Sequence, residues 1–316
     1  MQCKSQCLDF KSGLNFEPLM LKNKEVFNSY IWPHGYNHSE ASFSNLYIWQ
    51  HAWDIKMATD EGALYVSMDS DIYRPLLLPP YLRNPHESIL PYMLKLEHYM
   101  KETYDGFYIK CATSAMVDKI KKDCGDRYRF EYDSYNSEYV YRTEDLINLK
   151  GKKYHGKRNH INAFNKKYVG VLDEYSPKYK DECLDLQTRW AKGKDFSERE
   201  IEEEYISVLK ALDNYQVLGF TGCVVKIDGK VQAFSFGERI SNDTVIIHIE
   251  KADSSFNGLY PFINREFVAN FWADVTYVNR AEDMGVPGIR KAKRSYNPVF
   301  MLEKYDVIPN GDWNGA

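Results

Sequence analysis

The sequence predicts a mixed α/β (α+β) fold of two tandem units, each a mixed, mostly antiparallel sheet flanked by helices. The expected elements of the second half follow the order β-α-α-β-β-β-α-β-α-β, and the first half, from Ala41, gives α-β-β-β-α-β-α-β, the tail of the same series. A strong hairpin signal, Asp228-Gly229 between two apolar runs, supports the antiparallel part. We therefore expect one unit used twice, detectable in element order and not in residue identity.

Composition indicates a globular protein. The 316 residues suit one large domain or two of ordinary size, and 44% hydrophobic with 27% charged residues excludes a disordered chain. No apolar run approaches the roughly 18 residues of a membrane helix, and the first residues lack the apolar core of a signal peptide. We expect a cytoplasmic protein without a transmembrane segment.

The cysteines do not indicate a metal site. They are scattered at positions 3, 7, 111, 124, 183 and 223 without a C-x-x-C pair. Reduced thiols are the expectation for a cytoplasmic chain.

The first half is expected to begin its regular structure at a helix with aromatic and apolar residues on 41–53. Three short strands, a helix, a strand, a helix entered through a Thr N-cap and a further strand follow, over 54–59, 63–69, 73–78, 86–101, 107–110, 113–122 and 128–132. A polar break at 133–137 leads to a domain boundary, so the expected units are residues 1–140 and 141–316.

The second half shows clearer patterns. Expected strands lie at 168–172, 215–227, 231–239, 244–250, 275–279 and 299–305, and expected helices at 177–191, 197–212, 258–272 and a short one after Pro287. Ser197 with Glu200 forms a capping box at the start of the second of these helices.

A basic linker helix is expected over 146–166. The stretch from Leu146 to Leu172 contains no acidic residue, carries seven lysines and arginines, and is interrupted by Gly151 and Gly156. It fits a salt-sensitive phosphate or tRNA contact through Lys150, Lys153, Lys157 and Arg158. A solvated linker helix explains the same residues without any partner. The net charge of −4 also does not favour nucleic-acid binding as a global property.

Residues 279–298 form the most informative run, with a turn, a short helix from Pro287 and an exit at Asn297-Pro298. Acidic residues precede this helix and Arg290, Lys291, Lys293 and Arg294 lie in its last turns, an order that complements the helix dipole. The run is either a well-capped surface helix or an anion-binding rim over a pocket beside Tyr296.

The series of elements resembles the GNAT acyltransferase fold, and the tandem arrangement resembles the Fem peptidyltransferases and the lysyl-phosphatidylglycerol synthase C-terminal family, also called DUF2156. The residues that carry the resemblance are those of 149–164, 250–260 and 282–298, with 288–298 similar to the lysine-bearing segment before the last strand. This resemblance implies transfer of an acyl group, in characterised relatives an aminoacyl group from aminoacyl-tRNA, to an amine or hydroxyl. It also implies that strands 244–250 and 275–279 splay apart and open a cleft.

The implied site lies where those strands separate. Acyl transfer needs a base, an oxyanion partner and an acid, for which Glu250, Lys293 and Tyr296 are the candidates. The cleft wall and the substrate contacts are expected to come from Asp253, Tyr260, Glu282, Asp283 and Arg290. Lys291 is the candidate phosphate anchor. For each residue a structural role, as a capping carboxylate, surface charge or packed aromatic, explains its type equally well.

The donor is left open between acyl-CoA and aminoacyl-tRNA, with a small-molecule, lipid or peptide acceptor. Residues 252–260 have a single glycine and an Asp where an acyl-CoA enzyme has a Gly-rich phosphate loop, so only a modified nest of Ser254, Ser255 and Gly258 remains for a pyrophosphate. The alternative function is a non-catalytic anion-binding, nucleotide-binding or regulatory module that keeps the GNAT fold.

Overall fold

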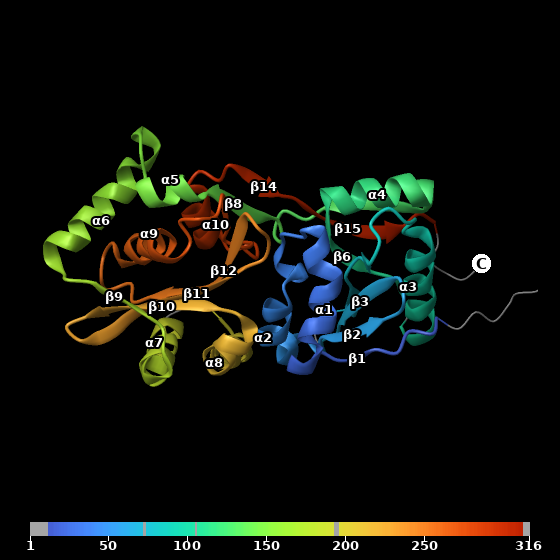
Figure 1. Ribbon diagram of the computed structural model, residues 1–316, viewed down its shortest axis with the longest axis horizontal. Coiled ribbons are helices and arrows are strands. Elements are labelled where there is room, and N and C mark those ends of the chain that lie inside the picture. Colours follow the sequence, from blue (N-terminus) through green and yellow to red (C-terminus); the bar gives the residue numbers. More distant parts are fainter. Residues whose placement is uncertain (1–11, 72–73, 105, 193–195, 312–316) are drawn as a thin grey trace, which may run out of the picture. The chain divides into compact units, whose positions relative to one another are not determined.

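The computed structural model describes residues 12–71, 74–104, 106–192 and 196–311. They form two compact units, each assembled from separated segments (Figure 1). Unit 1 contains the described residues of 12–19, 53–133 and 304–311, and unit 2 contains those of 20–52 and 134–303. The expected division into residues 1–140 and 141–316 makes each unit one continuous stretch, whereas each compact unit here combines segments from both halves of the chain. That the two halves are copies of one unit stays a prediction.

The sheet of unit 1 has the strand order β1-β2-β3-β4-β6-β15-β7, with β5 paired to β3. Among the described residues its single parallel contact joins β4 to β6 through Leu77 and Ile109, and the other pairs are antiparallel. The strands are β1 Glu17–Pro18, β2 Lys56–Thr59, β3 Ala63–Met68, β4 Leu76–Leu77, β5 Tyr81–Leu82, β6 Ile109–Thr113, β7 Tyr128–Tyr132 and β15 Lys304–Pro309.

Two helices accompany this sheet, α3 Leu90–Thr103 and α4 Ser114–Cys124. The predicted Thr N-cap of α4 is confirmed, because the Thr113 hydroxyl accepts the Met116 N–H at 3.4 Å. Met93, Leu96 and Met100 give α3 its buried stripe.

The sheet of unit 2 has the order β14-β8-β13-β12-β11-β10-β9. Here β12 and β13 form the parallel pair, and the remaining described pairs are antiparallel. The predicted mixed, mostly antiparallel sheets flanked by helices are therefore confirmed. The strands are β8 Glu138–Arg142, β9 Val171–Glu174, β10 Thr221–Ile227, β11 Lys230–Arg239, β12 Thr244–Ala252, β13 Tyr277–Asn279 and β14 Phe300–Leu302.

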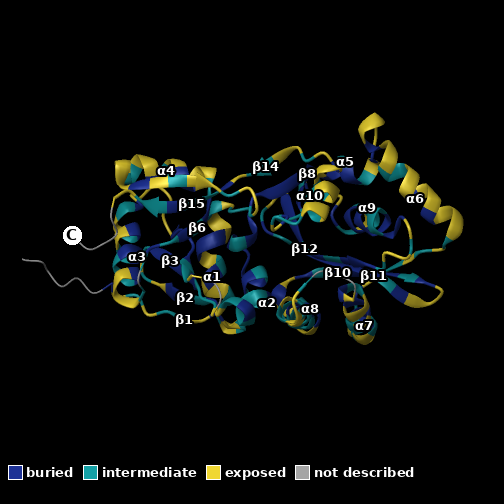
Figure 2. Cartoon of the chain, turned by 180° about the vertical axis from the view of Figure 1, so that it is seen from behind, coloured by how far each residue is buried: buried dark blue, intermediate teal, exposed yellow. Residues whose placement is uncertain are grey.

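Helices cover both faces of the unit 2 sheet. Figures 1 and 2 show α7 and α8 on one face and α9 with α6 on the other. The apolar side chains between α5, α6, α9 and the sheet include Phe164, Val225 and Phe267. The helices of this unit are α1 Lys24–Ile31, α2 Phe43–Trp53 (its last residue in unit 1), α5 Thr143–Asn148, α6 His155–Lys167, α7 Lys180–Ala191, α8 Glu198–Leu218, α9 Leu259–Phe271 and α10 Pro287–Arg294.

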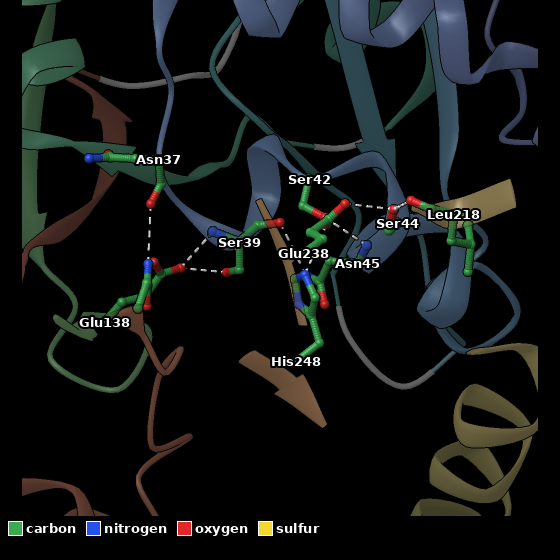
Figure 3. A network of polar contacts seen from close by, with 10 residues as sticks. Asn37, Ser39, Ser42, Ser44, Asn45, Glu138, Leu218, Glu238 and His248 are labelled. Atoms are coloured by element: carbon green, nitrogen blue, oxygen red, sulfur yellow. Dashed lines mark hydrogen bonds and ion pairs between the residues drawn. The ribbon is translucent and has the colours of Figure 1, made fainter. Parts of the chain in front are cut away.

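The segment before α2 and the first turn of α2 are held to the unit 2 sheet by polar contacts (Figure 3). Glu238 on β11 accepts hydrogen bonds from Ser42 and from Ser44, the latter at 2.9 Å, and its Oε1 lies 2.9 Å from His248 Nε2 on β12. Glu138 on β8 is fully buried and accepts from the Ser39 N–H at 2.8 Å. These contacts satisfy two carboxylates that burial would otherwise penalise.

Several element boundaries differ from the predictions. Residues 215–218 belong to α8, so β10 begins only at Thr221, and α6 runs through Gly156 without a break. The sequence reasoning missed α1 and missed β8, which it treated as part of a polar boundary. The Asp228-Gly229 hairpin is confirmed, with φ of 51° and 78° at the two turn residues.

Candidate functional site

Strands β12 and β13 diverge after three residue pairs. They are joined through Thr244 with Tyr277, Val245 with Val278 and Ile246 with Asn279. β12 then continues to Ala252 paired with β11, whereas β13 ends. From Ile247 onward β12 has no strand on its β13 side among the described residues, as the resemblance to splayed strands predicts. This place is called the β12/β13 divergence below.

Two local features end the ladder there. The register of β12 against β11 shifts so that Phe236 faces Ile249 and Gly237 faces Ile247, which leaves His248 as the extra residue of a β-bulge. After β13, Asn279 Oδ1 accepts the Ala281 N–H at 2.9 Å, and Ala281 has a φ of 55°. The bulge bends β12 and the turn stops β13 directly after their last pair.

A buried ion pair occupies the β12/β13 divergence. Glu250 Oε1 accepts from Arg280 Nη2 at 2.8 Å, and both side chains are 12% exposed. Glu250 Oε2 accepts from Asn264 Nδ2 of α9 at 2.9 Å. Burial alone would lower the pKa of Arg280, but the Glu250 charge outweighs burial and raises that pKa, so the guanidinium is charged.

One nitrogen of this pair is free. Arg280 Nη1 is buried and has no hydrogen-bond partner among the described residues. A buried donor left in that condition costs roughly 1–3 kcal/mol. Arg280 Nη1 is therefore the donor of the ion pair whose hydrogen-bonding capacity the described residues leave unused.

Tyr296 packs beside the ion pair. Its ring centroid lies 4.8 Å from Arg280 Cζ and 3.7 Å from Lys157 Nζ, and its carbonyl accepts from the Tyr154 hydroxyl at 3.0 Å. The Tyr141 ring meets it edge-on at 6.3 Å. Burial raises the pKa of Tyr296, so its hydroxyl keeps its proton at neutral pH.

Lys293 contacts backbone rather than the ion pair. Its Nζ donates to the carbonyl of Arg280 at 2.5 Å and to that of Glu282. Burial, with a smaller contribution from the Arg280 charge, lowers the pKa of Lys293 to about 8. Lys293 thereby fixes the turn that presents Arg280.

Asp283 and Arg290 form a second, structural ion pair. The fully buried Asp283 carboxylate accepts from Arg290 Nε and Nη2, each at 2.8 Å, from the Tyr139 hydroxyl at 2.5 Å and from the Gly285 N–H at 2.9 Å. Burial by itself would raise the pKa of Asp283, but these hydrogen bonds outweigh it and lower that pKa to about 2. The pair ties α10 to β8, so both residues are already occupied.

The loop before α9 does not fit a pyrophosphate. Asp253 Oδ1 accepts the Ser255 N–H at 2.9 Å, and its Oδ2 lies 2.5 Å from Arg189 Nη1, so a carboxylate stands where a phosphate was expected. Gly258 has a φ of +92°, and a Cβ there would lie 2.2 Å from the carbonyl oxygen of His160 on α6. Its missing side chain makes room for α6, not for a ligand, which argues against acyl-CoA.

The other predicted residues are dispersed. Lys291, Ser254 and Lys150 are exposed. The Tyr260 hydroxyl accepts from Trp190 Nε1 at 2.7 Å, and Lys153 Nζ lies 3.4 Å from Asp145.

Arg158 and Lys157, which were predicted to contact phosphate, both make contacts within the protein. Arg158 Nη1 donates to the carbonyls of Leu149 and Gly151, the latter at 2.7 Å, so it caps the end of α5. Lys157 turns toward Tyr296 instead of solvent.

The structure thus brings together Glu250, Tyr296 and Lys293, and their chemical roles stay predictions. Sequence reasoning missed Arg280 and Asn264. Arg280 directly follows β13, a position that could have signalled it, because side chains after neighbouring parallel strands meet at one sheet edge. Asn264 in α9 gave no signal of its own.

Solved structures define the class of this fold. A protein of unknown function from Bacteroides thetaiotaomicron VPI-5482 is 30% identical with a TM-score of 0.84, covering 94% of this chain and 100% of that one. L-PGS from Bacillus licheniformis is 16% identical with a TM-score of 0.62, covering 95% and 94%. A tandem GNAT protein from the clavulanic acid biosynthesis pathway is 10% identical with a TM-score of 0.50, covering 95% and 100%. The last two show the fold alone, which is the tandem GNAT-like fold.

The family follows from the sequence match. A family model described as phosphatidylglycerol lysyltransferase, C-terminal, matches residues 35–308. The chain belongs to this family, and the resemblance drawn from residues 149–164, 250–260 and 282–298 is confirmed.

Two properties of the described residues bear on partners. No helix within 12–71, 74–104, 106–192 or 196–311 is both long and apolar enough to cross a bilayer. Within the same ranges no three His, Cys, Asp or Glu side chains gather as metal ligands.

Proposed function

We propose that this chain is an aminoacyltransferase that moves an aminoacyl group from aminoacyl-tRNA to a hydroxyl or amine of a lipid or peptide acceptor. The observation that carries the proposal is the Glu250–Arg280 ion pair, held in the β12/β13 divergence with one guanidinium nitrogen unpaired. Family membership supports the class of reaction.

The geometry supports distinct roles for the two charges. Attack on an ester carbonyl creates an oxyanion, which a buried, permanently charged donor stabilises more strongly than an exposed one. Arg280 Nη1 is such a donor. Glu250 has both oxygens occupied by Arg280 and Asn264, so it orients the guanidinium instead of acting as the base that its sequence position suggested.

Tyr296 is the candidate acid for the departing oxygen. Its hydroxyl remains protonated at neutral pH because burial raises its pKa. In the overall reaction the bond between carbonyl carbon and donor oxygen breaks, the bond to the acceptor forms, and one proton passes from acceptor to leaving oxygen.

The experiment is a transfer assay with purified chain, a panel of radiolabelled aminoacyl-tRNAs beginning with lysyl-tRNA, and either phosphatidylglycerol vesicles or an amine-bearing peptide. We expect label to move to one acceptor, and Arg280→Met to reduce transfer by about 100-fold or more, the size of effect measured for a lost oxyanion contact. Absence of transfer from every aminoacyl-tRNA to either acceptor would overturn the proposal.

A non-catalytic binding module is the second candidate, favoured by the loop that Asp253 and Gly258 close to a pyrophosphate. A thermal-shift panel with acetyl-CoA, a long acyl-CoA and charged tRNA separates the candidates. A ligand at 100 times its Kd stabilises the folded state by about 2.7 kcal/mol. We expect charged tRNA to raise the Tm and the CoA esters to leave it unchanged.

A further inference from the structure

The proposed reaction requires a group that accepts the proton of the attacking hydroxyl or amine, and the inference below rests on that proposed function. The titratable and charged groups around the β12/β13 divergence come from several elements packed there. They include Glu250 of β12, Arg280 after β13, Lys293 and Tyr296 at the end of α10, Tyr141 of β8, Tyr154 before α6 and Lys157 of α6, while Cys223 of β10, Tyr260 of α9 and Glu282 before α10 act on Glu250 or Lys293.

Most of these groups are committed to other bonds or hold their proton. Both Glu250 oxygens accept hydrogen bonds, and Lys293 Nζ is directed at two backbone carbonyls. A guanidinium does not deprotonate in proteins, which excludes Arg280. Burial raises the pKa of Tyr296, of Tyr141 and of Tyr154, so these phenols are neutral donors.

Lys157 differs from all of them. Its Nζ lies 3.7 Å from the Tyr296 ring centroid and, among the described residues, has neither a hydrogen-bond acceptor nor a carboxylate within bonding distance. Burial first, and then the Arg280 charge, lowers the pKa of Lys157 to about 8, against a smaller opposing effect of Glu250. Roughly a tenth of such an amine is neutral at pH 7, a far larger share than for an exposed lysine.

Helix α6 holds this amine in place. Ile161 and Phe164 anchor the helix in the core, and the Gly258 backbone approaches the His160 carbonyl too closely for any side chain. Arg158, the next residue, caps α5 through the carbonyls of Leu149 and Gly151. Lys157 is therefore positioned by contacts of its neighbours and by the Tyr296 ring, and within the described part of the chain its Nζ makes no hydrogen bond or ion pair that proton transfer would break.

We propose that Lys157 is the general base of the transfer reaction. Neutral Lys157 Nζ takes a proton from the acceptor hydroxyl or neutral amine while the acceptor atom bonds to the acyl carbon. The bond between that carbon and the donor oxygen then breaks, and the leaving oxygen receives a proton from Tyr296. The Lys157 ammonium then returns its proton through water to the Tyr296 phenolate, so with a hydroxyl or neutral amine acceptor no net proton is gained or lost.

The test is a pH profile combined with chemical rescue, using lysyl-tRNA and phosphatidylglycerol vesicles. We expect kcat/KM of the unmodified chain to rise tenfold per pH unit up to about pH 8 and then to level off. Lys157→Ala should lower kcat/KM by about 100-fold to 10,000-fold, and added methylamine should restore part of the loss. Lys157→Arg keeps the charge but cannot give up a proton, so it should be as inactive as the alanine variant.

The matched control is Lys178→Ala. Lys178 is exposed, and its Nζ lies 4.8 Å from the ring of Tyr179, so it shares the lysine–tyrosine contact without the site. Its activity and pH profile should not change. Circular dichroism of each variant separates loss of folding from loss of the base.

The outcomes distinguish the two proposals. Transfer by the unmodified chain, with a Lys157→Ala loss that methylamine repairs, supports the general base. Transfer that is flat between pH 6 and 9, or a Lys157→Ala variant within threefold of the unmodified chain, overturns the general base and leaves the transferase standing. A chain without transfer activity to any acceptor overturns both.

Discussion

Glu250 Oε1 and Arg280 Nη2 lie 2.8 Å apart, across the point where two parallel strands stop pairing. Thirty residues separate them in the chain, and a bulge at His248 together with a turn at Ala281 brings them face to face. The charges of both residues act on the pKa values of Lys157 and Tyr296.

Glu250→Gln should move the pH dependence of transfer. Removing this carboxylate takes away the charge that raises the pKa of Lys157, so that pKa should fall below about 8 and the rising limb should shift to lower pH. The maximal rate should fall by about tenfold or more because Arg280 loses its orienting partner. The measurement is kcat/KM from pH 6 to 9.

Glu250→Asp serves as the conservative variant. It keeps the negative charge, so the rising limb of its pH profile should lie close to that of the unmodified chain, even where the maximal rate does not recover. A limb that stays in place in Glu250→Gln would contradict the electrostatic coupling of Glu250 with Lys157.

Asp283→Asn should destabilise the chain. The fully buried carboxylate accepts from Arg290, Tyr139 and the Gly285 N–H, and an amide cannot replace all of these bonds, so the free energy of unfolding should fall by about 1–3 kcal/mol. The control is Asp274→Asn, whose carboxylate is 68% exposed and should change stability by less than about 0.5 kcal/mol. Urea unfolding at pH 7 measures both.

The same carboxylate should give the fold an acid-sensitive component. The folded pKa of Asp283, about 2, lies below its unfolded value near 3.9. Its contribution is therefore fully present above about pH 4 and is lost as the pH falls toward 2. Unfolding free energies of the chain and of Asp283→Asn should converge over that window; a constant difference would contradict the assignment.

Gly258→Ala and Gly288→Ala should have opposite effects. At Gly258 a methyl group would meet the His160 carbonyl oxygen at 2.2 Å in a left-handed backbone conformation, which should cost about 2–4 kcal/mol. At Gly288, inside α10, nothing lies within 4 Å of the added carbon, so alanine should stabilise by about 0.5–1 kcal/mol. Differential scanning calorimetry reports both. Equal effects would contradict the packing of α6 against α9.

Lys150→Gln and Arg158→Ala should separate tRNA contact from structure. Lys150 is exposed, so its loss should weaken tRNA binding and reduce the salt slope by about 1 without altering stability. Arg158 caps the end of α5, so its loss should lower stability by about 1–2 kcal/mol. Filter binding over 50–200 mM salt and urea unfolding test the two halves. An unchanged salt slope for Lys150→Gln would argue against this surface as a phosphate contact.

Much of the fold was readable from local chemistry. The Asp228-Gly229 turn, the Ser197 capping box, the Thr113 N-cap and Pro287 at the start of α10 each act within a few residues, and each occurs as predicted. β8 was missed because its burial comes from neighbours far along the chain, β13 and β14. The end of α8 at Leu218 was also missed, although Gly219, with a φ of 79°, is a local C-cap signal.

The candidate site was predictable only in part. The separation of β12 and β13 and the proximity of Glu250 to Tyr296 were expected, and the structure contains both. The partner of Glu250 was not, because a single Arg after a short strand carries no periodic signal. The sequence also did not predict the direction of the Lys157 side chain. One face of α6 is solvated and the other is buried, and the long, flexible stem of a lysine can reach toward either.

The position of β15 has a consequence for synthesis on the ribosome. This strand, Lys304–Pro309, lies between β6 and β7, so β7 joins its sheet only through a segment that is translated long after β7 itself. The residues up to β7 can emerge and collapse, yet β6 and β7 have no strand between them until β15 has been made. Nascent chains arrested before residue 304 should therefore show protease-sensitive β7, with protection arising abruptly once β15 clears the exit tunnel.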